Sequence, residues 1–576
     1  MRFAHSPVLA PTFPPWRARL VLIALGVAFG VLVGRAAYLQ GWNRDFLQAK
    51  GESRYSRTLE IPAHRGRILD RNGEALAIST PVKSIWAMPD DVALSARQLA
   101  ALAGALGVPR EEVGRRLAAT ERDFVYLRRQ VPPETAERVA TLGMPGIYQS
   151  KEYRRYYPAG ETMAHVLGFT DVDDVGQEGI ELAYQSELAG RPGSRRVIKD
   201  RLGQVVEDVE SVREARDGRD LVLALDSRIQ SLAYAQLKRA VEHHRANGGG
   251  IVVLDATTGE VLALANLPTY NPNNRAKLVG SQLRNRAVTD AFEPGSTLKP
   301  FTIALALEMG RLAPTTLIDT APGSLTIGPA TIRDPHPEKA LTVEQVIQKS
   351  SNVGAAKIAL QLPAAAMWDM FDDVGFGTAP QLGFPGEAIG RVRPYKSWRP
   401  IEQATMSYGH GIAVSLVQLA RAYTVFARDG ELLPLSLLKL DGPPPGKSVL
   451  SQRTAGMVRH MLELAVEPGG TAPRARIMGY RVAGKTGTAY KQENGGYVPG
   501  KYIASFVGFA PASRPRLVVA VMIDEPTDGE YYGGAVAAPV FAEVMAGSLR
   551  ILGVPPDAPM NPIELPPAAL EVRESA

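Results

Sequence analysis

The chain has 576 residues, 45% of them hydrophobic, which is long and apolar enough for two or three domains with buried cores and excludes general disorder. Its 65 basic and 59 acidic residues give a net charge of +6 with the two signs mixed along the chain, which is not the pattern of a nucleic-acid-binding protein. The absence of cysteine excludes disulfides, thiolate catalysis and cysteine-based metal sites.

The first predicted element is a transmembrane helix over residues 16–40. Residues 20–33 are an unbroken run of apolar residues and glycine, and the whole segment has about the length that crosses a bilayer. Arginines but no acidic residues precede the run, so the positive-inside rule places residues 1–15 in the cytoplasm and the rest of the chain outside. A cleaved signal peptide is the alternative, but the run is longer than a signal sequence and lacks a clear cleavage site.

The first domain outside the membrane is expected over residues 41–218. It is rich in charge and short turns, and Asn72-Gly73 is typical of a tight hairpin. It contains no compact cluster of histidines and carboxylates, so we expect an irregular, extended, noncatalytic domain. Its patch Arg154-Arg155-Tyr156-Tyr157 is either a docking face or an ordinary packed edge, and the packed edge is the simpler interpretation.

A second domain is expected over residues 219–553, followed by a loose Pro-rich tail over residues 554–576. Apolar periodicity changes repeatedly between helix and strand in the second domain, which predicts an antiparallel sheet with many helices. The predicted elements are a strand over 221–225, a helix over 227–244 that Gly248-Gly249-Gly250 ends, a hairpin of 251–254 and 261–265, and two strands over 502–509 and 517–523.

The sharpest local motif is Ser296-Thr297-Leu298-Lys299, which leads into a helical pattern over residues 302–308. A serine at the start of a helix lies beside the positive end of the helix dipole. Lys299 follows on the same face one turn later, where its amine, if held neutral by burial and neighbouring cations, is a candidate general base. The tetrapeptide alone is weak evidence, because serine caps helices and lysine covers their surfaces in many proteins.

Two further elements follow in order, and the three together form the motif set of penicillin-binding proteins and class A β-lactamases. They are Ser350-Ser351-Asn352 and Lys485-Thr486-Gly487-Thr488. Ser350 offers a hydroxyl that can relay a proton between Lys299, Ser296 and a leaving amine. The amide of Asn352 can bond a peptide group of a substrate.

The Lys-Thr-Gly-Thr element has the composition of a strand that grips a carboxylate. Lys485 supplies a positive charge, and the hydroxyls of Thr486 and Thr488 supply hydrogen bonds. Gly487 allows the strand to come close to a ligand. The backbone NH groups of Ser296 and Thr488 are the candidate oxyanion hole.

The order of these elements resembles that of the class B penicillin-binding proteins, most closely their division-specific branch, over nearly the whole chain. Besides the anchor and the catalytic elements, the resemblance rests on Arg65-Gly66-Arg67-Ile68-Leu69-Asp70-Arg71, Gly179-Ile180-Glu181, Tyr408-Gly409-His410-Gly411 and Tyr531-Tyr532-Gly533-Gly534. It implies a multi-domain α+β protein with a single transmembrane helix and a noncatalytic pedestal of the dimerisation type. The catalytic part would be the penicillin-recognising transpeptidase fold, an antiparallel five-stranded sheet between helices plus an all-helical lobe.

The resemblance also implies a reaction. Ser296, assisted by Lys299, attacks the carbonyl between the two terminal D-alanines of a donor stem peptide, and D-alanine leaves with a proton delivered through Ser350. An acceptor amine of a neighbouring stem, expected to be that of diaminopimelate, then attacks the acyl-enzyme. β-Lactams would acylate the same serine, and neither a cofactor nor a metal is expected.

The expected location is a bacterial inner membrane, with the catalytic domain in the periplasm and a role at the division septum. The expected partners are stem peptides, division-complex proteins and a membrane-embedded glycan polymerase of the FtsW type. Gly26, Gly30 and Gly34 recur every fourth residue and would give the anchor a flat face for a second membrane helix.

Several alternatives share the fold or a motif. An elongation-type transpeptidase and a D,D-carboxypeptidase remain open, whereas a bifunctional synthase lacks the chain length for a second catalytic domain. A β-lactamase would need a deacylating glutamate, which residues 391–394 do not offer, and Glu402 lacks the context. A noncatalytic β-lactam sensor or division scaffold would need cytoplasmic signalling machinery, for which the short segment before the anchor leaves little room.

A nucleotide site is the competing interpretation of the third element. Residues 479–486 match the P-loop pattern, and Asp524-Glu525 after an apolar run imitates an ATPase strand. A P-loop must lead into a helix, however, and residues 487–490 predict a strand. We therefore expect Asp524 and Glu525 to be solvated strand-end residues, and His410 to be structural or substrate-facing.

Overall fold

The computed structural model describes residues 14–43, 56–118, 124–199, 205–493, 496–564 and 572. The chain forms two compact units, the first from Met1–Ala63 and Arg191–Asp217 and the second from His64–Gly190 and Gly218–Ala576. Most of the predicted cytoplasmic tail (1–13) and the end of the Pro-rich tail (565–571 and 573–576) lie outside the described residues. The domain boundaries drawn from the sequence stay predictions.

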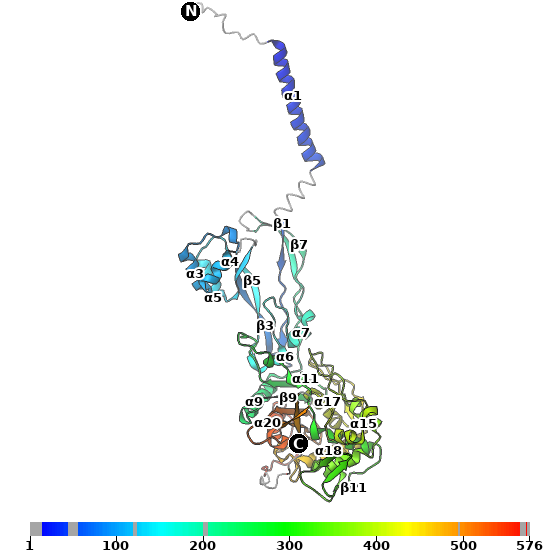
Figure 1. Ribbon diagram of the computed structural model, residues 1–576. Helices are drawn as coiled ribbons and strands as arrows, with labels where there is room; N and C mark the ends of the chain where they lie inside the picture. The colour runs from blue at the N-terminus through cyan, green and yellow to red at the C-terminus, as the bar shows by residue number, and fades with distance from the viewer. Residues whose placement is uncertain are drawn as a thin grey trace, which may run out of the picture. The chain divides into compact units, whose positions relative to one another are not determined.

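The first unit contains the predicted transmembrane helix. Helix α1 (Pro15–Ala37) continues into a π-helical turn, η2 (Tyr38–Trp42), and Pro15–Gly41 is long and apolar enough to cross a membrane (Figure 1). Cβ atoms added at its Gly26, Gly30 and Gly34 would meet nothing within 4 Å. The unit also holds an antiparallel sheet in the order β1 (Ser56–Ile61), β6 (Gly193–Lys199), β7 (Val205–Arg213).

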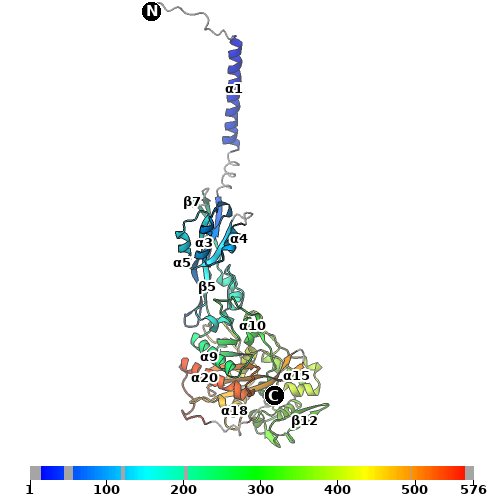
Figure 2. The ribbon, with the colours of Figure 1, turned by 60° about the vertical axis from the view of Figure 1, so that its left-hand side comes forward.

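The second unit begins with the pedestal part, a mixed sheet with small helices beside it (Figure 2). The predicted Asn72-Gly73 turn is confirmed, because it joins β2 to β3 as an antiparallel hairpin. Helix α3 starts at the capping box of Ser95 and Gln98 and ends at Gly107, whose φ is 64°. The pedestal elements are β2 (Ile68–Leu69), β3 (Ala75–Ala87), α3 (Ala96–Leu106), α4 (Arg110–Leu117), β4 (Val125–Val131), α5 (Pro133–Thr141), β5 (Ile147–Tyr156), α6 (Ala164–Leu167), α7 (Gly179–Ala183), α8 (Gln185–Leu188) and β8 (Leu221–Val222).

A buried ion triad fastens three separate pieces of the pedestal. Glu181 accepts hydrogen bonds from Arg65 Nε at 2.7 Å and from Arg155 Nε at 2.6 Å, and all three side chains are at most 1% exposed. Arg65 also donates to the carbonyl oxygens of Glu181 and Asp174. Two of the sequence motifs, around Arg65 and around Glu181, therefore meet in the core of the pedestal.

The catalytic part is built on a five-stranded antiparallel sheet in the order β10-β9-β19-β18-β17. The predicted hairpin of residues 251–265 and the two later strands are confirmed. The strands are β9 (Gly248–Asp255), β10 (Val261–Leu267), β17 (Ala483–Glu493), β18 (Gly496–Ala510) and β19 (Leu517–Asp524).

Two details of the sequence interpretation are wrong. The strand expected over residues 221–225 spans only Leu221–Val222 and pairs in parallel with β2 of the pedestal. The run Gly248-Gly249-Gly250 does not end the preceding helix but begins β9. The glycines are needed because this strand is closely packed against its neighbours. A Cβ at Gly248 would lie 2.5 Å from the Leu267 oxygen, and one at Gly249 would lie 2.7 Å from the Met522 oxygen.

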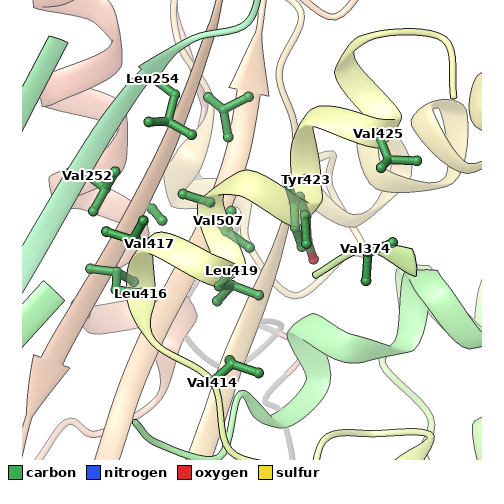
Figure 3. Close-up of a cluster of buried hydrophobic side chains, with 14 of the residues drawn as sticks. Val252, Leu254, Val374, Val414, Leu416, Val417, Leu419, Tyr423, Val425 and Val507 are labelled. Carbon is green, nitrogen blue, oxygen red and sulfur yellow. The ribbon is translucent and has the colours of Figure 1, made fainter. Parts of the chain in front are cut away.

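Helices cover both faces of the catalytic sheet, and strand β9 shows why. Its residues alternate, with Ile251 and Val253 in the core against α9 and α20, and Val252 and Leu254 in the core against α17. Figure 3 shows Val252 beside Leu416 and Val417 of α17. The helices are α9 (Ser227–His243), α17 (Leu416–Ala427), α18 (Gln452–Val466) and α20 (Ala538–Ile551). The segment Gly533–Ile551, which includes α20, is long and apolar enough to span a membrane, but α20 packs in this core.

The lobe between β10 and β17 contains helices and also small sheets. Two-stranded pairs form between β11 (Leu317–Asp319) and β14 (Ala340–Thr342) and between β12 (Ser324–Ile327) and β13 (Ala330–Arg333). The lobe also contains α10 (Gly280–Leu283), α11 (Arg286–Thr289), η5 (Gly295–Leu298), α12 (Lys299–Glu308), α13 (Val343–Gln348), α14 (Asn352–Ala359), α15 (Ala364–Asp373), α16 (Pro400–Met406), β15 (Glu431–Leu432) and β16 (Lys447–Ser448). A short helix, α19 (Gly533–Val536), follows β19.

The start of the Pro-rich tail is not loose, contrary to the sequence interpretation. Asp557 accepts hydrogen bonds from the backbone NH of Arg481 at 2.7 Å and from Ser513 Oγ at 2.6 Å. Tyr480 donates to the carbonyl oxygen of Val554 at 2.6 Å. These contacts hold the tail against the segment that leads into β17.

The buried triad predicts that a conservative substitution of Glu181 strongly destabilises the pedestal. Glu181→Gln removes the buried negative charge that two buried guanidiniums share, so we expect the free energy of unfolding of the pedestal to fall by about 3–5 kcal/mol. Urea unfolding of the full chain in detergent, followed by tryptophan fluorescence, measures this loss. Glu137→Gln, at an exposed position of α5, is the control and should change stability by less than about 0.5 kcal/mol. Equal stability of the two variants would contradict the role of the triad.

Candidate active site

The predicted nucleophile lies in a buried turn that precedes its helix. Ser296 is in the 3₁₀ turn η5, and α12 begins at Lys299, so the lysine follows one turn after the serine. The turn is fixed from two sides, since Thr297 Oγ1 donates to the Pro294 oxygen at 2.7 Å and Tyr423 of α17 donates to the Thr297 oxygen at 2.8 Å. The Ser296 side chain therefore has a defined position with 3% exposure.

Four of the predicted site residues meet around one hydroxyl group. Lys299 Nζ lies 2.8 Å from Ser296 Oγ and 3.0 Å from Ser350 Oγ, and it donates to the Ser350 carbonyl at 2.6 Å. Lys485 Nζ lies 2.9 Å from Ser350 Oγ on its other side. Both lysines are fully buried. The sequence separates these groups by up to 189 positions, and the fold joins them in a continuous hydrogen-bonded chain.

Ser350 has a strained backbone that an aspartate supports. Its φ of 59° is in the left-handed region, which costs energy for a residue with a Cβ. The next residues begin α14, where Asp334 accepts hydrogen bonds from the NH groups of Asn352 at 2.6 Å and Val353 at 3.0 Å and from Ser351 Oγ at 2.5 Å. Asp334 thus neutralises the positive end of α14 and fixes the corner that carries Ser350 and Asn352.

The Lys-Thr-Gly-Thr element lies on β17, the edge strand of the sheet, beside the serine turn. Thr486 Oγ1 lies 3.1 Å from Lys485 Nζ and 3.0 Å from Thr471 Oγ1, while Thr488 Oγ1 accepts from the NH of Gly533 at 3.0 Å. A Cβ at Gly487 would lie 2.6 Å from the Pro294 oxygen, so only glycine permits this approach. The strand conformation contradicts the P-loop interpretation, since Lys485 does not precede a helix.

The Tyr-Gly-His-Gly motif lies on the other side of the serine turn. A Cβ at Gly409 would lie 2.2 Å from the Gly295 oxygen, which explains the glycine by close packing. Burial and the charge of Lys299 lower the pKa of His410 to about 4. The imidazole is therefore neutral at physiological pH and acts as a packed aromatic group beside Tyr408 and Tyr497. The structure favours the structural interpretation of His410.

Glu293 connects the serine turn to the β17–β18 hairpin. Its carboxylate accepts hydrogen bonds from the NH of Gly411 at 2.7 Å, from Gln492 Nε2 at 2.8 Å and from the Tyr497 hydroxyl at 3.0 Å. Burial raises the pKa of Glu293, and the hydrogen bonds oppose that shift. A single carboxylate close to Ser296 in the sequence therefore binds both the Tyr-Gly-His-Gly loop and the β17–β18 hairpin.

The expectation that Asp524 is a solvated strand-end residue is wrong. Asp524 is 3% exposed and lies 2.9 Å from Lys491 Nζ and 3.1 Å from Arg286 Nη1. The acidic group lies on the central strand β19 and is neutralised by cations from β17 and α11, so it is a structural ion pair. Within the described residues no group of three or more His, Cys, Asp or Glu side chains could hold a metal ion.

Asp334, Glu293 and Tyr423 were not predicted from the sequence. Glu293 precedes the serine motif directly, and this proximity is the only signal that the sequence offers for any of them. Asp334 and Tyr423 act from other elements of the lobe and the helical layer. Each supports a catalytic element through backbone groups, which no local pattern reveals.

A buried serine hydroxyl in contact with a lysine amine, beside a second lysine on a glycine-containing strand edge, is the arrangement of a serine acyltransferase. Comparisons with known proteins agree. Residues 249–546 match the family described as Penicillin binding protein transpeptidase domain, and residues 60–223 match the Penicillin-binding Protein dimerisation domain.

The similarity to relatives extends over nearly the whole chain. The probable peptidoglycan D,D-transpeptidase PenA of Neisseria gonorrhoeae is 46% identical over 561 residues, which are 97% of this chain and 96% of the relative. The peptidoglycan D,D-transpeptidase FtsI of Escherichia coli strain K12 is 43% identical over 552 residues, 95% of this chain and 93% of the relative. The apo structure of the TP domain of Burkholderia pseudomallei penicillin-binding protein 3 superposes with a TM-score of 0.55 at 52% identity, covering 58% of this chain and 98% of that domain.

The chain therefore belongs to the class B penicillin-binding proteins, with a dimerisation-type domain followed by a transpeptidase domain. The fold class and the family expected from the sequence are confirmed. The chemical roles of the individual site residues stay predictions, to which the measured geometry adds support.

Removal of the Asp334 charge should slow acylation without touching the nucleophile. Asp334→Asn removes the negative charge at the start of α14 and leaves one acceptor oxygen for the NH groups of Asn352 and Val353 and the hydroxyl of Ser351, so the corner at Ser350 is held less well. We expect the rate of acylation by fluorescent penicillin to fall by about 10- to 100-fold, the equivalent of one or two lost charge-assisted hydrogen bonds. The control is Asp429→Asn, on an exposed helix end, which should acylate normally. A normal rate in Asp334→Asn would contradict this assignment.

Glu293 should give the acylation rate a dependence on pH. Because burial raises its pKa, Glu293 takes up a proton at a higher pH than an ordinary glutamate, and the protonated acid cannot accept all of its hydrogen bonds. We expect acylation of the wild type to fall as the pH decreases through this pKa. Glu293→Gln should be about 3- to 30-fold slower near neutral pH and should lose this component of the acid limb.

The control for Glu293 is Glu543→Gln, an exposed position of α20, whose pH profile should follow that of the wild type. A parallel profile for Glu293→Gln would show that another group produces the acid limb.

Proposed function

We infer that the protein is a peptidoglycan D,D-transpeptidase that cross-links stem peptides through an acyl-enzyme on Ser296. The observation that carries this conclusion is the contact chain from Ser296 through Lys299 and Ser350 to Lys485. The curated relatives named peptidoglycan D,D-transpeptidases support the substrate class, because they match over nearly the full chain.

Acylation begins with proton removal from the nucleophile. Lys299 in its neutral form takes the proton of Ser296, whose oxygen forms a bond to the carbonyl carbon between the two terminal D-alanines. The negative charge develops on the carbonyl oxygen, and we assign the NH groups of Ser296 and Thr488 to bind it. The C–N bond then breaks, and the proton passes from Lys299 through Ser350 to the departing D-alanine amine.

The same groups complete the transfer in reverse order. An acceptor amine attacks the acyl carbonyl carbon and loses a proton through Ser350 to Lys299. The bond to Ser296 breaks, and its oxygen regains the proton, so that the enzyme returns to its starting state. Lys485 with the hydroxyls of Thr486 and Thr488 would bind the terminal carboxylate of the donor, and Asn352 its peptide group.

A β-lactamase needs a base that activates water against the acyl-enzyme, and Glu402 does not suit that role. It accepts from the NH of Arg399 at 2.7 Å and from Arg393 Nη1 at 3.1 Å. The Arg399 and Arg393 interactions lower the pKa of Glu402 to about 2. A carboxylate so fully engaged with arginines is a poor proton acceptor, which favours transfer to an amine over rapid hydrolysis.

The proposed location follows from the anchor. We place the N-terminus in the cytoplasm and the catalytic domain in the periplasm, because basic residues precede α1. A division-specific role is supported by the relative named FtsI. The glycines at 26, 30 and 34 of α1 suit close packing against a membrane-embedded polymerase of the FtsW type.

The central test is replacement of the nucleophile. We expect Ser296→Ala to abolish labelling of the full chain by fluorescent penicillin and to abolish formation of cross-linked product from a D-Ala-D-Ala pentapeptide and an amine acceptor. Ser231→Ala, at an exposed position of α9, should retain both reactions. Intact mass measurement over hours separates the enzyme classes, because a β-lactamase loses the penicilloyl adduct quickly and a transpeptidase keeps it. Labelling of the Ser296→Ala variant would refute the nucleophile.

A further inference from the structure

A polar cavity of about 500 Å³ lies in the second unit at the ends of the pedestal strands β4 and β5. None of the site residues lines it. Its most prominent feature is charge, since five arginines and one carboxylate, Asp171, contribute to its wall. The lining residues are Arg128, Arg129, Gln130, Val131, Pro132, Arg154, Arg155, Tyr157, Thr170, Asp171, Val172, Pro272, Asn273, Arg275 and Ala276.

Two of the five arginines are neutralised by the pedestal itself. Arg129 pairs with Asp173 at 2.6 Å and with Glu152 at 3.2 Å. Arg155 pairs with Glu181, which it shares with Arg65. The carboxylate of Asp174 also lies near Arg65 and Arg155, so two carboxylates balance these two guanidiniums.

The other three arginines have no carboxylate within ion-pair distance in the described part of the chain. Arg128 donates to the carbonyl oxygen of Leu106, and Arg275 donates to those of Pro272 at 2.6 Å and Thr170 at 3.0 Å. The Arg154 side chain is exposed, and no hydrogen bond of its guanidinium is found among the described residues. Concentration of like charges around one cavity is unfavourable unless an anion enters it.

Arg155 adds an independent observation. Its side chain is 1% exposed, and its Nη2 atom has no hydrogen-bond partner among the described residues, although Nε and Nη1 bond Glu181 and Ser79. A buried guanidinium donor without a partner costs free energy, and such donors are rare in folded proteins. Because Arg155 lines the cavity, a carboxylate bound there is the group that would satisfy it.

An aromatic surface continues from the cavity. The Arg129 guanidinium lies over the Tyr126 ring at 4.9 Å, and Tyr126 contacts Phe124 with a centroid distance of 5.4 Å. Phe124 in turn contacts Trp86, which stacks on Tyr148. Phe124 is 50% and Tyr126 is 37% exposed. Exposed Tyr and Phe side chains beside a half-buried Trp and arginine have the composition of protein–protein hot spots, whereas a site for a free anion needs no such surface.

We propose that this cavity and its aromatic surface bind an acidic segment of a partner protein, with carboxylates at Arg154, Arg155 and Arg275 and an apolar side chain at Tyr126 and Phe124. In the arginine-tyrosine patch of the sequence, Arg154 and Tyr156 are exposed whereas Arg155 and Tyr157 are buried, so the proposal assigns a docking role to its exposed part. The site is separate from the acyltransfer groups, so it does not depend on the proposed reaction.

The test uses the full chain in a neutral detergent and two fluorescent probes, hexaglutamate and a six-residue peptide of four glutamates followed by two leucines. Fluorescence anisotropy should show that Arg154→Glu weakens both peptides by about 10- to 100-fold, as a reversed charge at the centre of a site does. Tyr126→Ala should weaken only the leucine-containing peptide, by about 3- to 10-fold. Arg514→Glu, an exposed arginine outside the cavity, should leave both affinities as in the wild type.

Labelling of each variant with fluorescent penicillin reports on the fold and on Ser296 separately from the docking site, so failure of one proposal leaves the other testable. Equal peptide affinities for Arg154→Glu and Arg514→Glu would overturn the proposal. So would binding of inorganic phosphate that is tighter than that of either peptide at the same ionic strength, since it would indicate a site for a small anion. If Tyr126→Ala weakened the binding of both peptides equally, the aromatic surface would not be part of the site that recognises the apolar side chain.

Discussion

The catalytic site depends on one hydroxyl group shared by two buried lysines. Ser350 Oγ lies 3.0 Å from Lys299 Nζ and 2.9 Å from Lys485 Nζ, and both lysine side chains are fully buried. Burial of two basic groups at such a distance is costly unless each is hydrogen-bonded in a rigid surrounding. The left-handed backbone of Ser350 and the support by Asp334 provide that rigidity, and they hold the Ser350 hydroxyl, the relay group of our proposal, in place.

Three backbone segments can approach one another closely because glycines lie at their points of contact. The serine turn lies between β17 and the Tyr-Gly-His-Gly loop, where Cβ atoms at Gly487 and Gly409 would overlap the Pro294 and Gly295 oxygens. A Cβ at Gly533 would overlap the oxygens of Ser505 and Gly487, so α19 packs closely against β18 and β17. The short motifs of the sequence therefore mark places where backbone meets backbone, which is why they lie far apart in the chain and together in the fold.

The pedestal uses charge in two ways. Inside, Glu181 joins Arg65 and Arg155 and fixes three segments of the domain to one another. Toward the cavity, arginines exceed carboxylates, and an exposed aromatic surface adjoins them. The first arrangement stabilises the domain and the second offers a surface for a partner, so one noncatalytic domain combines support with recognition.

The sequence by itself determined the family and the fold class, and it predicted the members of the catalytic set, because Ser296-Lys299, Ser350-Asn352 and Lys485–Thr488 have fixed local spacings. It also determined the anchor helix and most strands of the sheet, since these follow from apolar length and alternation. Only the tertiary structure decided that Leu221–Val222 belongs to the pedestal sheet and that Gly248–Gly250 are packed strand residues. The same holds for Asp334 and Tyr423, which act on backbone groups from distant elements, for Glu293, whose partners lie far along the chain, and for the buried Asp524. Such roles arise from burial and from partners far along the chain, and neither quantity is encoded in a local pattern.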